Sequence, residues 1–486
     1  MNSLLDYDEL LNAVSGKSVG LAFSEKKFYF TSVVTDSRSV VGGSLFVPLI
    51  GQNQDGHKYI PQAIEKGATA VFVASDEYEA DSRKYMELAG GHPQILFVVV
   101  SDTLHALQDA AAAYVAKFPK LLKIGITGSS GKTTTKEMTV AVLKQKYNVV
   151  YNEGNLNSET GLPLSVFKIR KDDEIGVFEM GMNRVDEIGE IAAVLKPQYA
   201  LVTNIGTAHI GILGSRKNIA EEKRKIFGYI PEDGAAFIPA ADDFAAFLSE
   251  GIKGSIINYG RDVPPSESGV TFVSDDGISG TTFKTGGEDV HLKLPGIYNY
   301  QNALGAIAVG RYFGVSDELI KNALESFMPI AGRTETESFE LRGGTRVTLV
   351  KDCYNANPDS MAKVLAFCGS VKNVCHRIYV LGDMLELGKE SAEEHAKVGA
   401  EAVTASPDQI IFIGNEMKYA AAAAKSAGFT NALYIPDADD NAVELAAQFL
   451  IDCVEPGDLL LLKASRGIQL ERIIPLIGIS EGNSNG

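Results

Sequence analysis

The sequence predicts an α/β protein with three domains, each built around its own sheet. At 486 residues the chain is longer than one hydrophobic core supports, and roughly three domains is the expectation from length. Short apolar runs typical of buried strands alternate with stretches of helical periodicity in two separate series, a pattern that predicts parallel sheets covered by helices. The first hundred residues have shorter runs and more turns, which indicates a smaller α/β domain ahead of the two series.

The first domain is expected to span residues 1–103. Turns separate its strand-like runs, and one helical stretch lies near residues 60–66. The runs are Lys27–Val34, Ser44–Pro48, Ala70–Val73 and Ile95–Val100.

The second domain is expected to span residues 104–328. It begins with apolar side chains at helical spacing, from Leu104 to Tyr114. Three apolar runs then predict buried strands of a parallel sheet: Lys123–Thr127, Glu174–Glu179 and Tyr199–Asn204. A different, more β-rich piece is expected over residues 235–294, and helical periodicity returns at residues 299–312.

The third domain is expected to span residues 329–486, with alanine-rich helices between its strands. The predicted strands are Arg346–Lys351, Arg377–Leu381, Gln409–Ile413, Ala432–Ile435 and Asp458–Leu462. Such a βα series predicts a Rossmann-like parallel sheet, and sheets of this kind bind ligands at the carboxyl ends of their strands.

The composition excludes several functional classes. The formal net charge is -17, from 45 basic and 62 acidic residues, and it argues against binding to nucleic acid or to an anionic membrane. No run approaches the ~20 apolar residues that cross a bilayer, and residues 1–17 mix acidic side chains with leucines, unlike a secretion signal. The four cysteines lack metal-ligand spacing, which favours reduced thiols in a cytoplasmic protein.

One loop has the residues of a phosphate-binding site. A buried-strand pattern ends at Thr127, a Gly-rich turn follows, and a helical pattern begins directly afterwards. Backbone N–H groups of such a turn converge on phosphate oxygens, while Lys132 supplies charge to the β- and γ-phosphates and Thr133 can ligate Mg²⁺. The usual GxxxxGK[ST] pattern is not met, because Ile126 occupies the first glycine position, and a bare turn is the alternative. The residues expected to bind ATP are Gly128, Ser129, Ser130, Gly131, Lys132, Thr133 and Thr134.

Three further residues could bind a metal ion or balance the charge of the phosphates. Glu179 ends a predicted strand, where a carboxylate reaches a nucleotide-bound Mg²⁺, although an ordinary strand-end acid fits as well. His209 follows the next strand in a loop, where a histidine is more often structural than a ligand. Lys223 lies beside the apolar stripe of a predicted helix, where burial would lower its pKa and favour the neutral, nucleophilic amine. On these residues alone, a lysine whose aliphatic chain covers apolar surface is the favoured interpretation.

Taken together, these residues resemble the Mur ligase family, the ATP-dependent amide ligases of peptidoglycan precursor synthesis. The family's phosphate loop also lacks the first glycine, which accounts for Ile126. The resemblance implies a central P-loop ATPase-like domain in which Thr133, Glu179 and His209 hold Mg²⁺, with two ions expected. It also implies that Lys223 carries a carbamate derived from CO₂, an anion that supports the second metal ion.

Further segments follow the family's order along the chain. Residues 296–302 resemble the motif G-x-H-N-x-x-N, whose last residue, Asn302, would contact the nucleotide. Tyr298 stands where the family has histidine, which leaves the role of that position open. Arg333 matches the arginine that opens the C-terminal domain and reaches the ATP phosphates, and Asp352 matches the acid that holds the ribose.

The N-terminal residues resemble the uridine-nucleotide domain of the ligases that add the third amino acid and the terminal dipeptide. Segments 154–157, 354–357 and 382–388 favour the second of these, whose substrates would be UDP-MurNAc-tripeptide and D-alanyl-D-alanine. The ligase for the third amino acid is expected to carry Asp-Asn-Pro-Arg, which this sequence lacks, and a folylpolyglutamate synthase lacks the N-terminal domain. The residues expected to bind the substrates here are Ser37, Arg38, Asp55, His57, Asn155 and Asn157.

The resemblance implies that ATP phosphorylates the tripeptide carboxylate and that the dipeptide amine attacks the acyl phosphate, with ADP and phosphate as products. Lys132 and Arg333 would neutralise charge. Lys463, Ser465 and Arg466 follow a predicted strand and suit the dipeptide carboxylate, although a solvated loop is an equal alternative. We expect a monomer. A P-loop switch, a small-molecule kinase and a silent ATP-binding protein are disfavoured, whereas diaminopimelate and lysine stay open as the third peptide residue.

Overall fold

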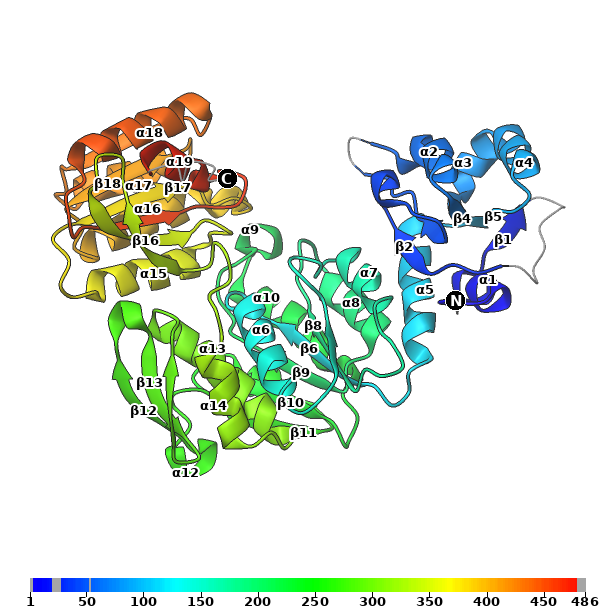
Figure 1. The fold of residues 1–486 in the computed structure, drawn as a ribbon, viewed down its shortest axis with the longest axis horizontal. Coiled ribbons are helices and arrows are strands. Elements are labelled where there is room, and N and C mark those ends of the chain that lie inside the picture. Colours follow the sequence, from blue (N-terminus) through cyan, green and yellow to red (C-terminus); the bar gives the residue numbers. More distant parts are fainter. Residues whose placement is uncertain (1–2, 20–27, 52–53, 479–486) are drawn as a thin grey trace, which may run out of the picture.

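The structure, a computed structural model, describes residues 3–19, 28–51 and 54–478. The described residues form three domains, with the N-terminal and C-terminal domains attached to a central one (Figure 1). The start of the predicted run at Lys27 lies outside the described residues. The predicted α/β class with several parallel sheets is confirmed.

The N-terminal domain holds a five-stranded sheet in the order β1-β5-β4-β3-β2. Three of its strands are parallel neighbours, β3 (Ser44–Phe46), β4 (Ala68–Ala74) and β5 (Leu96–Val100), while β1 (Lys17–Val19) runs antiparallel to β5 and β2 (Ser32–Val34) parallel to β3. Helix α1 (Tyr7–Val14) begins with a capping box, in which Asp6 accepts from the N–H of Glu9 and the Glu9 side chain accepts from the N–H of Asp6. The remaining helices of this domain are α2 (Ile60–Glu65), α3 (Ser75–Ala80) and α4 (Ser82–Gly91).

The central domain is built on a six-stranded parallel sheet in the order β11-β10-β9-β6-β8-β7. The strands are β6 (Leu122–Thr127), β7 (Val149–Tyr151), β8 (Ile175–Glu179), β9 (Tyr199–Val202), β10 (Ala235–Pro239) and β11 (Ser255–Tyr259). Every residue of β8 and β10 is buried, as expected for strands covered by helices on both faces. The helices that matter for the site are α6 (Lys132–Leu143), α9 (Ile210–Leu213) and α10 (Arg216–Arg224).

The β-rich piece expected over residues 235–294 divides between two sheets. Strands β10 and β11 extend the central parallel sheet, whereas β12 (Val270–Asp275), β13 (Thr281–Thr285) and β14 (Glu288–Leu292) form a separate antiparallel sheet. The interpretation of one separate piece was therefore wrong for its first two strands. Helices α13 (Ile297–Tyr312) and α14 (Asp317–Glu325) follow.

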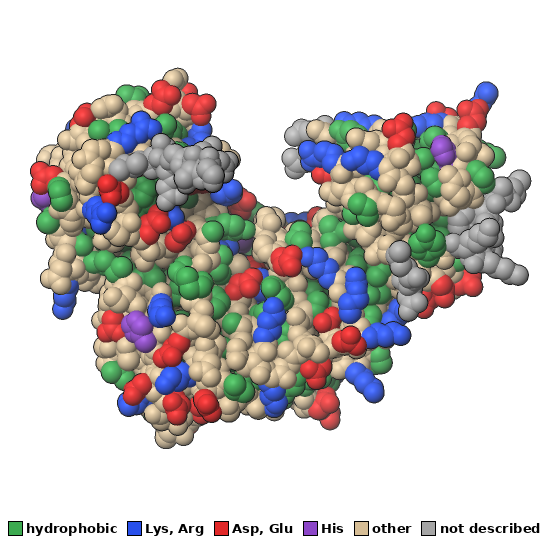
Figure 2. Space-filling view, in the orientation of Figure 1, with side chains coloured by type: hydrophobic (Ala, Val, Ile, Leu, Met, Phe, Trp, Pro, Cys, Tyr) green, Lys and Arg blue, Asp and Glu red, His purple; other side chains and the backbone are tan. Residues whose placement is uncertain are grey.

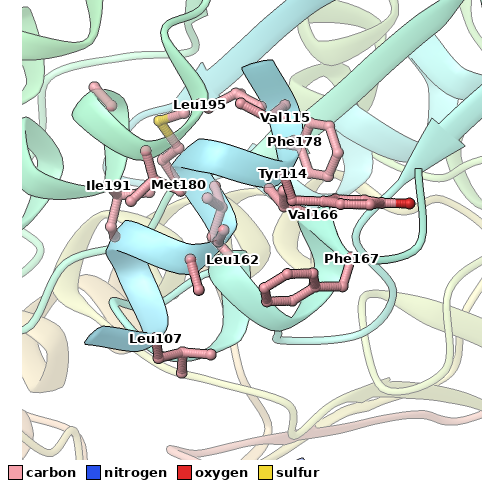
Figure 3. Close-up of a cluster of buried hydrophobic side chains, with 14 of the residues drawn as sticks. Leu107, Tyr114, Val115, Leu162, Val166, Phe167, Phe178, Met180, Ile191 and Leu195 are labelled. Atoms are coloured by element: carbon pink, nitrogen blue, oxygen red, sulfur yellow. The ribbon is translucent and has the colours of Figure 1, made fainter. Parts of the chain in front are cut away.

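A continuous apolar core joins the N-terminal and central domains. Helix α5 (Thr103–Ala116) supplies Leu107, Tyr114 and Val115 to a buried cluster that also contains Phe178 of β8 (Figure 3). Helices α7 (Gly161–Val166) and α8 (Glu187–Leu195) complete the cluster. The Tyr114 hydroxyl donates to the Ile169 carbonyl at 2.7 Å, so the one polar atom of this side chain is satisfied.

The C-terminal domain has a six-stranded sheet in the order β15-β16-β20-β17-β18-β19, parallel except for the edge strand β15. Its strands are β15 (Glu335–Glu340), β16 (Arg346–Asp352), β17 (Arg377–Gly382), β18 (Gln409–Ile413), β19 (Ala432–Ile435) and β20 (Leu459–Lys463). The main helices are α15 (Pro358–Ser370), α16 (Ser391–Thr404), α17 (Met417–Ser426) and α18 (Asp440–Cys453). None of the helices in the described ranges is long and apolar enough to cross a membrane.

Candidate active site

A cavity of about 740 Å³ lies where the central and C-terminal domains meet. The central domain contributes the phosphate loop, the end of β8 and His209, and the C-terminal domain contributes residues that follow β16 and β20. These are carboxyl ends of parallel strands, where the sequence placed the ligand site. Predicted residues that line the cavity are Ser129, Ser130, Gly131, Lys132, Thr133, Thr134, Asn155, Asn157, Glu179, His209, Asn302, Arg333, Asp352, Lys463 and Arg466.

Glycine conformation and hydrogen bonds to a neighbouring loop fix the backbone of the phosphate loop. Gly128 has φ +151°, and a Cβ there would lie 1.8 Å from the Thr203 hydroxyl, so only glycine fits the turn. The Ser129 N–H donates to the Asn204 carbonyl at 3.0 Å, and the Ser130 N–H donates to the Asn204 side chain at 3.2 Å. Gly131 then caps α6, so the loop ends at a helix N-terminus, where anions bind favourably.

Lys132 occupies the first turn of α6 and points back over the loop. Its ammonium donates to the Gly128 carbonyl at 3.0 Å. Burial lowers the pKa of Lys132, and the positive charge of Arg333 acts in the same direction, while Glu179 opposes both. An anion bound in the loop would favour the charged ammonium and so offset the desolvation.

The two carboxylate oxygens of Glu179 differ in their hydrogen bonding. Its Oε1 accepts from the Asn157 amide at 2.6 Å, whereas Oε2 is buried and has no hydrogen-bond partner among the described residues. Asn152 fixes the backbone of Glu179 from both sides, since its amide accepts from the Glu179 N–H and donates to the Glu179 carbonyl. A buried, unpaired carboxylate oxygen is a costly feature that a bound cation would relieve.

His209 and Lys223 belong to two consecutive helices of the central domain, α9 and α10. His209 begins α9 with φ +65°, and its Nδ1 lies 3.4 Å from the Glu386 carboxylate, at ion-pair range but without hydrogen-bond geometry. Burial lowers the pKa of His209 more than Glu386 raises it. Lys223 is 1% exposed, and burial holds the pKa of its amine well below the ordinary value, with Lys132 adding to the effect.

The C-terminal domain brings a cation and an acid to the cavity. The Arg333 guanidinium stacks on the Tyr354 ring at 4.1 Å, and its Nε is buried with no hydrogen-bond partner in the part of the chain that the structure describes. Asp352 accepts from the Thr334 N–H at 3.2 Å and from the Lys463 ammonium at 2.8 Å. Lys463 is therefore already engaged with the acid expected to hold the ribose, because the two residues are register partners on β16 and β20.

The residues present fit a divalent cation. Among the described residues, Glu179 Oε2 and His209 Nδ1 have no hydrogen-bond partner, and Glu179 and His209 line one cavity with Thr133. Carboxylate and hydroxyl oxygens are the ligand types that Mg²⁺ prefers. No group of three or more His, Cys, Asp or Glu residues able to hold a metal ion occurs in the described part of the chain. Additional ligands would have to come from phosphate oxygens or from a carbamate on Lys223.

Several predicted substrate residues lie away from this cavity. The N-terminal domain stands across an open gap from the C-terminal domain (Figure 2). In it, Ser37 donates to the Gln62 side chain at 2.6 Å and Arg38 pairs with Asp36, holding the pKa of that acid at about 2. His57 bonds Asp55 through Nδ1 at 2.6 Å and accepts from the Ala74 N–H through Nε2 at 3.0 Å.

In the C-terminal domain the two remaining candidates differ in accessibility. Ser465 is buried and bonds the Ala356 carbonyl and the Leu385 N–H. Arg466 is exposed at the cavity and pairs with Glu471 at 2.6 Å.

Sequence reasoning missed four residues at the domain interface. Asn204 ends a predicted strand, so the strand-end rule that selected Glu179 could have found it. Asp359 and Lys363 of α15, and Glu386 in a loop, contact the central domain from segments far away in the chain. Nothing in the local pattern marks Asp359 or Lys363, because an interface between domains has no periodicity along the chain. Glu386 lies in segment 382–388, which helped to distinguish the two ligases but gave this residue no role of its own.

Tyr298 replaces the family's histidine and ties two domains together. Its hydroxyl donates to the Thr334 hydroxyl at 2.9 Å, from the first turn of α13 to the segment before β15. Burial raises the pKa of Tyr298 well above its ordinary value, and the nearby Asp352 raises it further. The phenol therefore keeps its proton at physiological pH and remains a donor.

We expect Tyr298→Phe to weaken ADP binding about three- to tenfold, since a lost buried hydrogen bond costs ~0.5–1.5 kcal/mol. Isothermal titration calorimetry of ADP measures the change. The matched variant Tyr298→His restores the residue type of the family motif and should bind at least as well as Tyr298→Phe. An unchanged affinity in Tyr298→Phe would contradict a role for this hydroxyl.

Comparison with known proteins extends over nearly the whole chain. Residues 29–115, 126–310 and 333–466 match the family descriptions "Mur ligase family, catalytic domain", "Mur ligase middle domain" and "Mur ligase, glutamate ligase domain". A Treponema pallidum protein named UDP-N-acetylmuramoyl-tripeptide–D-alanyl-D-alanine ligase is 40% identical over 478 residues, covering 98% of this chain and 99% of the relative. The Bacillus subtilis protein of the same name is 35% identical and covers 91% and 92%.

Solved structures agree with the sequence relatives. The structure of MurF from Acinetobacter baumannii superposes with a TM-score of 0.80 at 26% identity, covering 97% of this chain and 98% of that one. MurF from Thermotoga maritima, solved in complex with ADP, gives 0.74 at 26% identity, covering 92% and 96%. The resemblance drawn from the sequence is confirmed: this chain belongs to the Mur ligase family, among the UDP-N-acetylmuramoyl-tripeptide–D-alanyl-D-alanine ligases.

Proposed function

We propose that this chain uses ATP to join D-alanyl-D-alanine to UDP-N-acetylmuramoyl-tripeptide, releasing ADP and phosphate. The observation that carries the proposal is one cavity shared by the phosphate loop, the unpaired carboxylate of Glu179 and the C-terminal residues Arg333 and Asp352. Relatives that bear the corresponding name align with more than nine-tenths of the chain. The amide product would be made in the cytoplasm, where ATP is available.

The first chemical step joins two anions. A carboxylate oxygen of the tripeptide attacks the γ-phosphorus, the bond from that phosphorus to the β-phosphate oxygen breaks, and ADP leaves. Because both reactants are negative, catalysis consists mainly of charge neutralisation and positioning. Of the cations that line the cavity, Lys132 and Arg333 would neutralise this charge, and Asn302 and Asp352 would hold the nucleoside end of ATP.

Mg²⁺ would be held by Thr133, Glu179 and His209, with a carbamate on Lys223 supporting a second ion. Bound Mg²⁺ supplies positive charge at the phosphate oxygens. Lys223 suits the carbamate because CO₂ reacts with a neutral amine, and burial disfavours the ammonium form of this side chain.

In the second step the neutral dipeptide amine attacks the acyl carbon, the carbon–oxygen bond to phosphate breaks, and the nitrogen gives up one proton as the amide forms. The dipeptide also brings a free carboxylate. Of Lys463, Ser465 and Arg466, only Arg466 has an exposed head at the cavity, since Lys463 pairs with Asp352 and Ser465 is buried. We therefore assign the carboxylate to Arg466, with Lys463 holding Asp352 in place.

We propose that residues 1–103 bind the uridine nucleotide, 104–328 bind ATP and 329–486 bind the dipeptide. Asn155 and Asn157 lie at the cavity, where they suit the peptide end of the first substrate. Ser37, Arg38, Asp55 and His57 would serve the uridine end. His57 would hold the domain in shape and not contact the substrate, because both of its ring nitrogens are already hydrogen-bonded within the domain.

One assay tests the reaction. Protein, MgATP, UDP-MurNAc-tripeptide and D-alanyl-D-alanine are combined, and phosphate release and product mass are measured together. We expect one phosphate for each product molecule, whose mass rises by that of the dipeptide less one water. Phosphate release without that gain would refute the proposal, and a parallel reaction with UDP-MurNAc-dipeptide and a single amino acid tests the ligase for the third residue.

A further inference from the structure

Helix α15 of the C-terminal domain touches the phosphate loop of the central domain. The Lys363 ammonium donates to the Ser130 hydroxyl at 2.8 Å, between residues 233 positions apart in the chain. One helical turn earlier, Asp359 accepts from the Thr207 N–H at 2.5 Å and from the Thr207 hydroxyl at 3.1 Å. A single helix thus contacts the loop after β6 and the loop after β9 at the same edge of the sheet.

Lys363 carries a charge that no acid neutralises directly. Within the described ranges, no carboxylate lies at ion-pair distance from its ammonium, and the side chain lines the same cavity as Lys132 and Arg333. Burial lowers the pKa of Lys363, although the acids Asp359 and Asp242 oppose the effect. A desolvated lysine beside a phosphate loop gains most when an anion occupies that loop.

The contact also orients the Ser130 hydroxyl. Its oxygen accepts from Lys363 at 2.8 Å and from the Asn204 amide at 3.1 Å, so its lone pairs are used. The Ser130 carbonyl is held as well, by the Thr203 hydroxyl at 2.7 Å and the Asn204 amide at 2.9 Å. The remaining group is the hydroxyl proton, whose protein acceptor, Asn204 Oδ1, lies at a weak 3.4 Å. A phosphate oxygen in the loop would be a better acceptor.

Two glycines let the domains approach this closely. A Cβ on Gly206 would lie 2.0 Å from the Asp359 carboxylate, and a Cβ on Gly211 would lie 2.3 Å from the backbone of Leu387. Any other residue at these positions would force the loops apart. The fit of α15 against the loop after β9 therefore depends on residues of both domains.

We propose that Lys363 is a positioning residue for ATP: it adds a C-terminal-domain cation to the phosphate loop and orients the Ser130 hydroxyl toward the bound phosphates. The proposal rests on the proposed function. It makes nucleotide affinity depend on whether the C-terminal domain is docked, because the loop has this cation only while α15 is in place. Cations brought to a phosphate site by a separate element are an established means of stabilising phosphoryl transfer.

The test compares Lys363→Ala with Lys372→Ala, which removes an exposed lysine just beyond the same helix. We measure the Kd of ADP and of a non-hydrolysable ATP analogue by calorimetry, and kcat and KM for each substrate. Lys363→Ala should weaken analogue binding roughly tenfold and lower kcat/KM for ATP by ~10- to 100-fold. KM for UDP-MurNAc-tripeptide should stay within twofold, and Lys363→Arg should recover part of the loss.

A purely structural role is distinguished by a double-mutant cycle with Ser130→Ala. If Lys363 acts through Ser130, its removal from a Ser130→Ala protein should cost much less than its removal from the wild type. Additive losses would overturn the orientation of Ser130 by Lys363, and an analogue Kd within twofold of the wild type would overturn the proposal as a whole. An inactive wild type would instead refute the proposed ligase function, while the analogue Kd would still test Lys363.

Discussion

Lys132→Ala should lower kcat/KM for ATP by at least ~10³-fold, the scale at which removal of a phosphate-clamping cation acts in phosphoryl transfer. The loss should lie mainly in kcat, because charge on the transferring phosphoryl group develops as the bond breaks. The ammonium already points over the loop, at 3.0 Å from the Gly128 carbonyl, and it shares the cavity with Glu179 and Arg333. Removing it leaves cations of the C-terminal domain, Arg333 and Lys363, as the substitutes in the same cavity.

Steady-state kinetics with coupled ADP detection measures this loss. The matched control is Lys144→Ala, which removes an exposed lysine just beyond the other end of α6. It should retain the activity of the wild type and the same thermal midpoint. A Lys132→Ala protein that is folded by circular dichroism and keeps a tenth of the activity would contradict the assignment.

The parts of the site that could be predicted share one property. Glu179 ends an apolar run and Lys132 lies in the turn and helix start that follow another, and an apolar run is a local signal of a buried strand. Since the strands of such a sheet are parallel, their carboxyl ends meet at one edge, and the residues that follow them converge whatever the strand order. Both side chains accordingly line one cavity.

The pairing of Asp352 with Lys463 could not be predicted in the same way. It exists because β20, the last strand of the chain, inserts between β16 and β17, which places the two residues in register. Strand order is a tertiary property, and nothing in either strand's own pattern encodes it. Two separate roles were therefore predicted for side chains that form one partly buried ion pair.

Strand β15 was missed for a different reason. Its residues, Glu335–Glu340, are mostly charged or hydroxylic and lie at the edge of the sheet, antiparallel to β16. An edge strand need not be apolar, because one side is open to solvent. Strands β10 and β11 were found as β-rich sequence, but their membership of the central sheet again depends on strand order.

Lys223→Met should abolish measurable ligation, a loss of ~10³-fold or more, without lowering the thermal midpoint. The two effects separate because Lys223 is 1% exposed and forms no hydrogen bond or ion pair among the described residues, so its removal leaves no partner unsatisfied. Methionine fills a similar volume without the cost of burying an ammonium. The control is Lys217→Met on the same helix, whose side chain is 73% exposed.

The carbamate itself is tested by ¹³C NMR after incubation with ¹³C-bicarbonate. The reaction consumes the neutral amine and CO₂ and releases one proton, so a buried lysine whose pKa is held low is modified where an exposed lysine is not. We expect one carbamate signal in the wild type and in Lys217→Met, and none in Lys223→Met. Added bicarbonate should not rescue Lys223→Met, because the nitrogen that accepts CO₂ is gone. Full ligation by Lys223→Met, or an unchanged signal in it, would remove the carbamate from this site and leave Thr133, Glu179 and His209 to hold the metal ions.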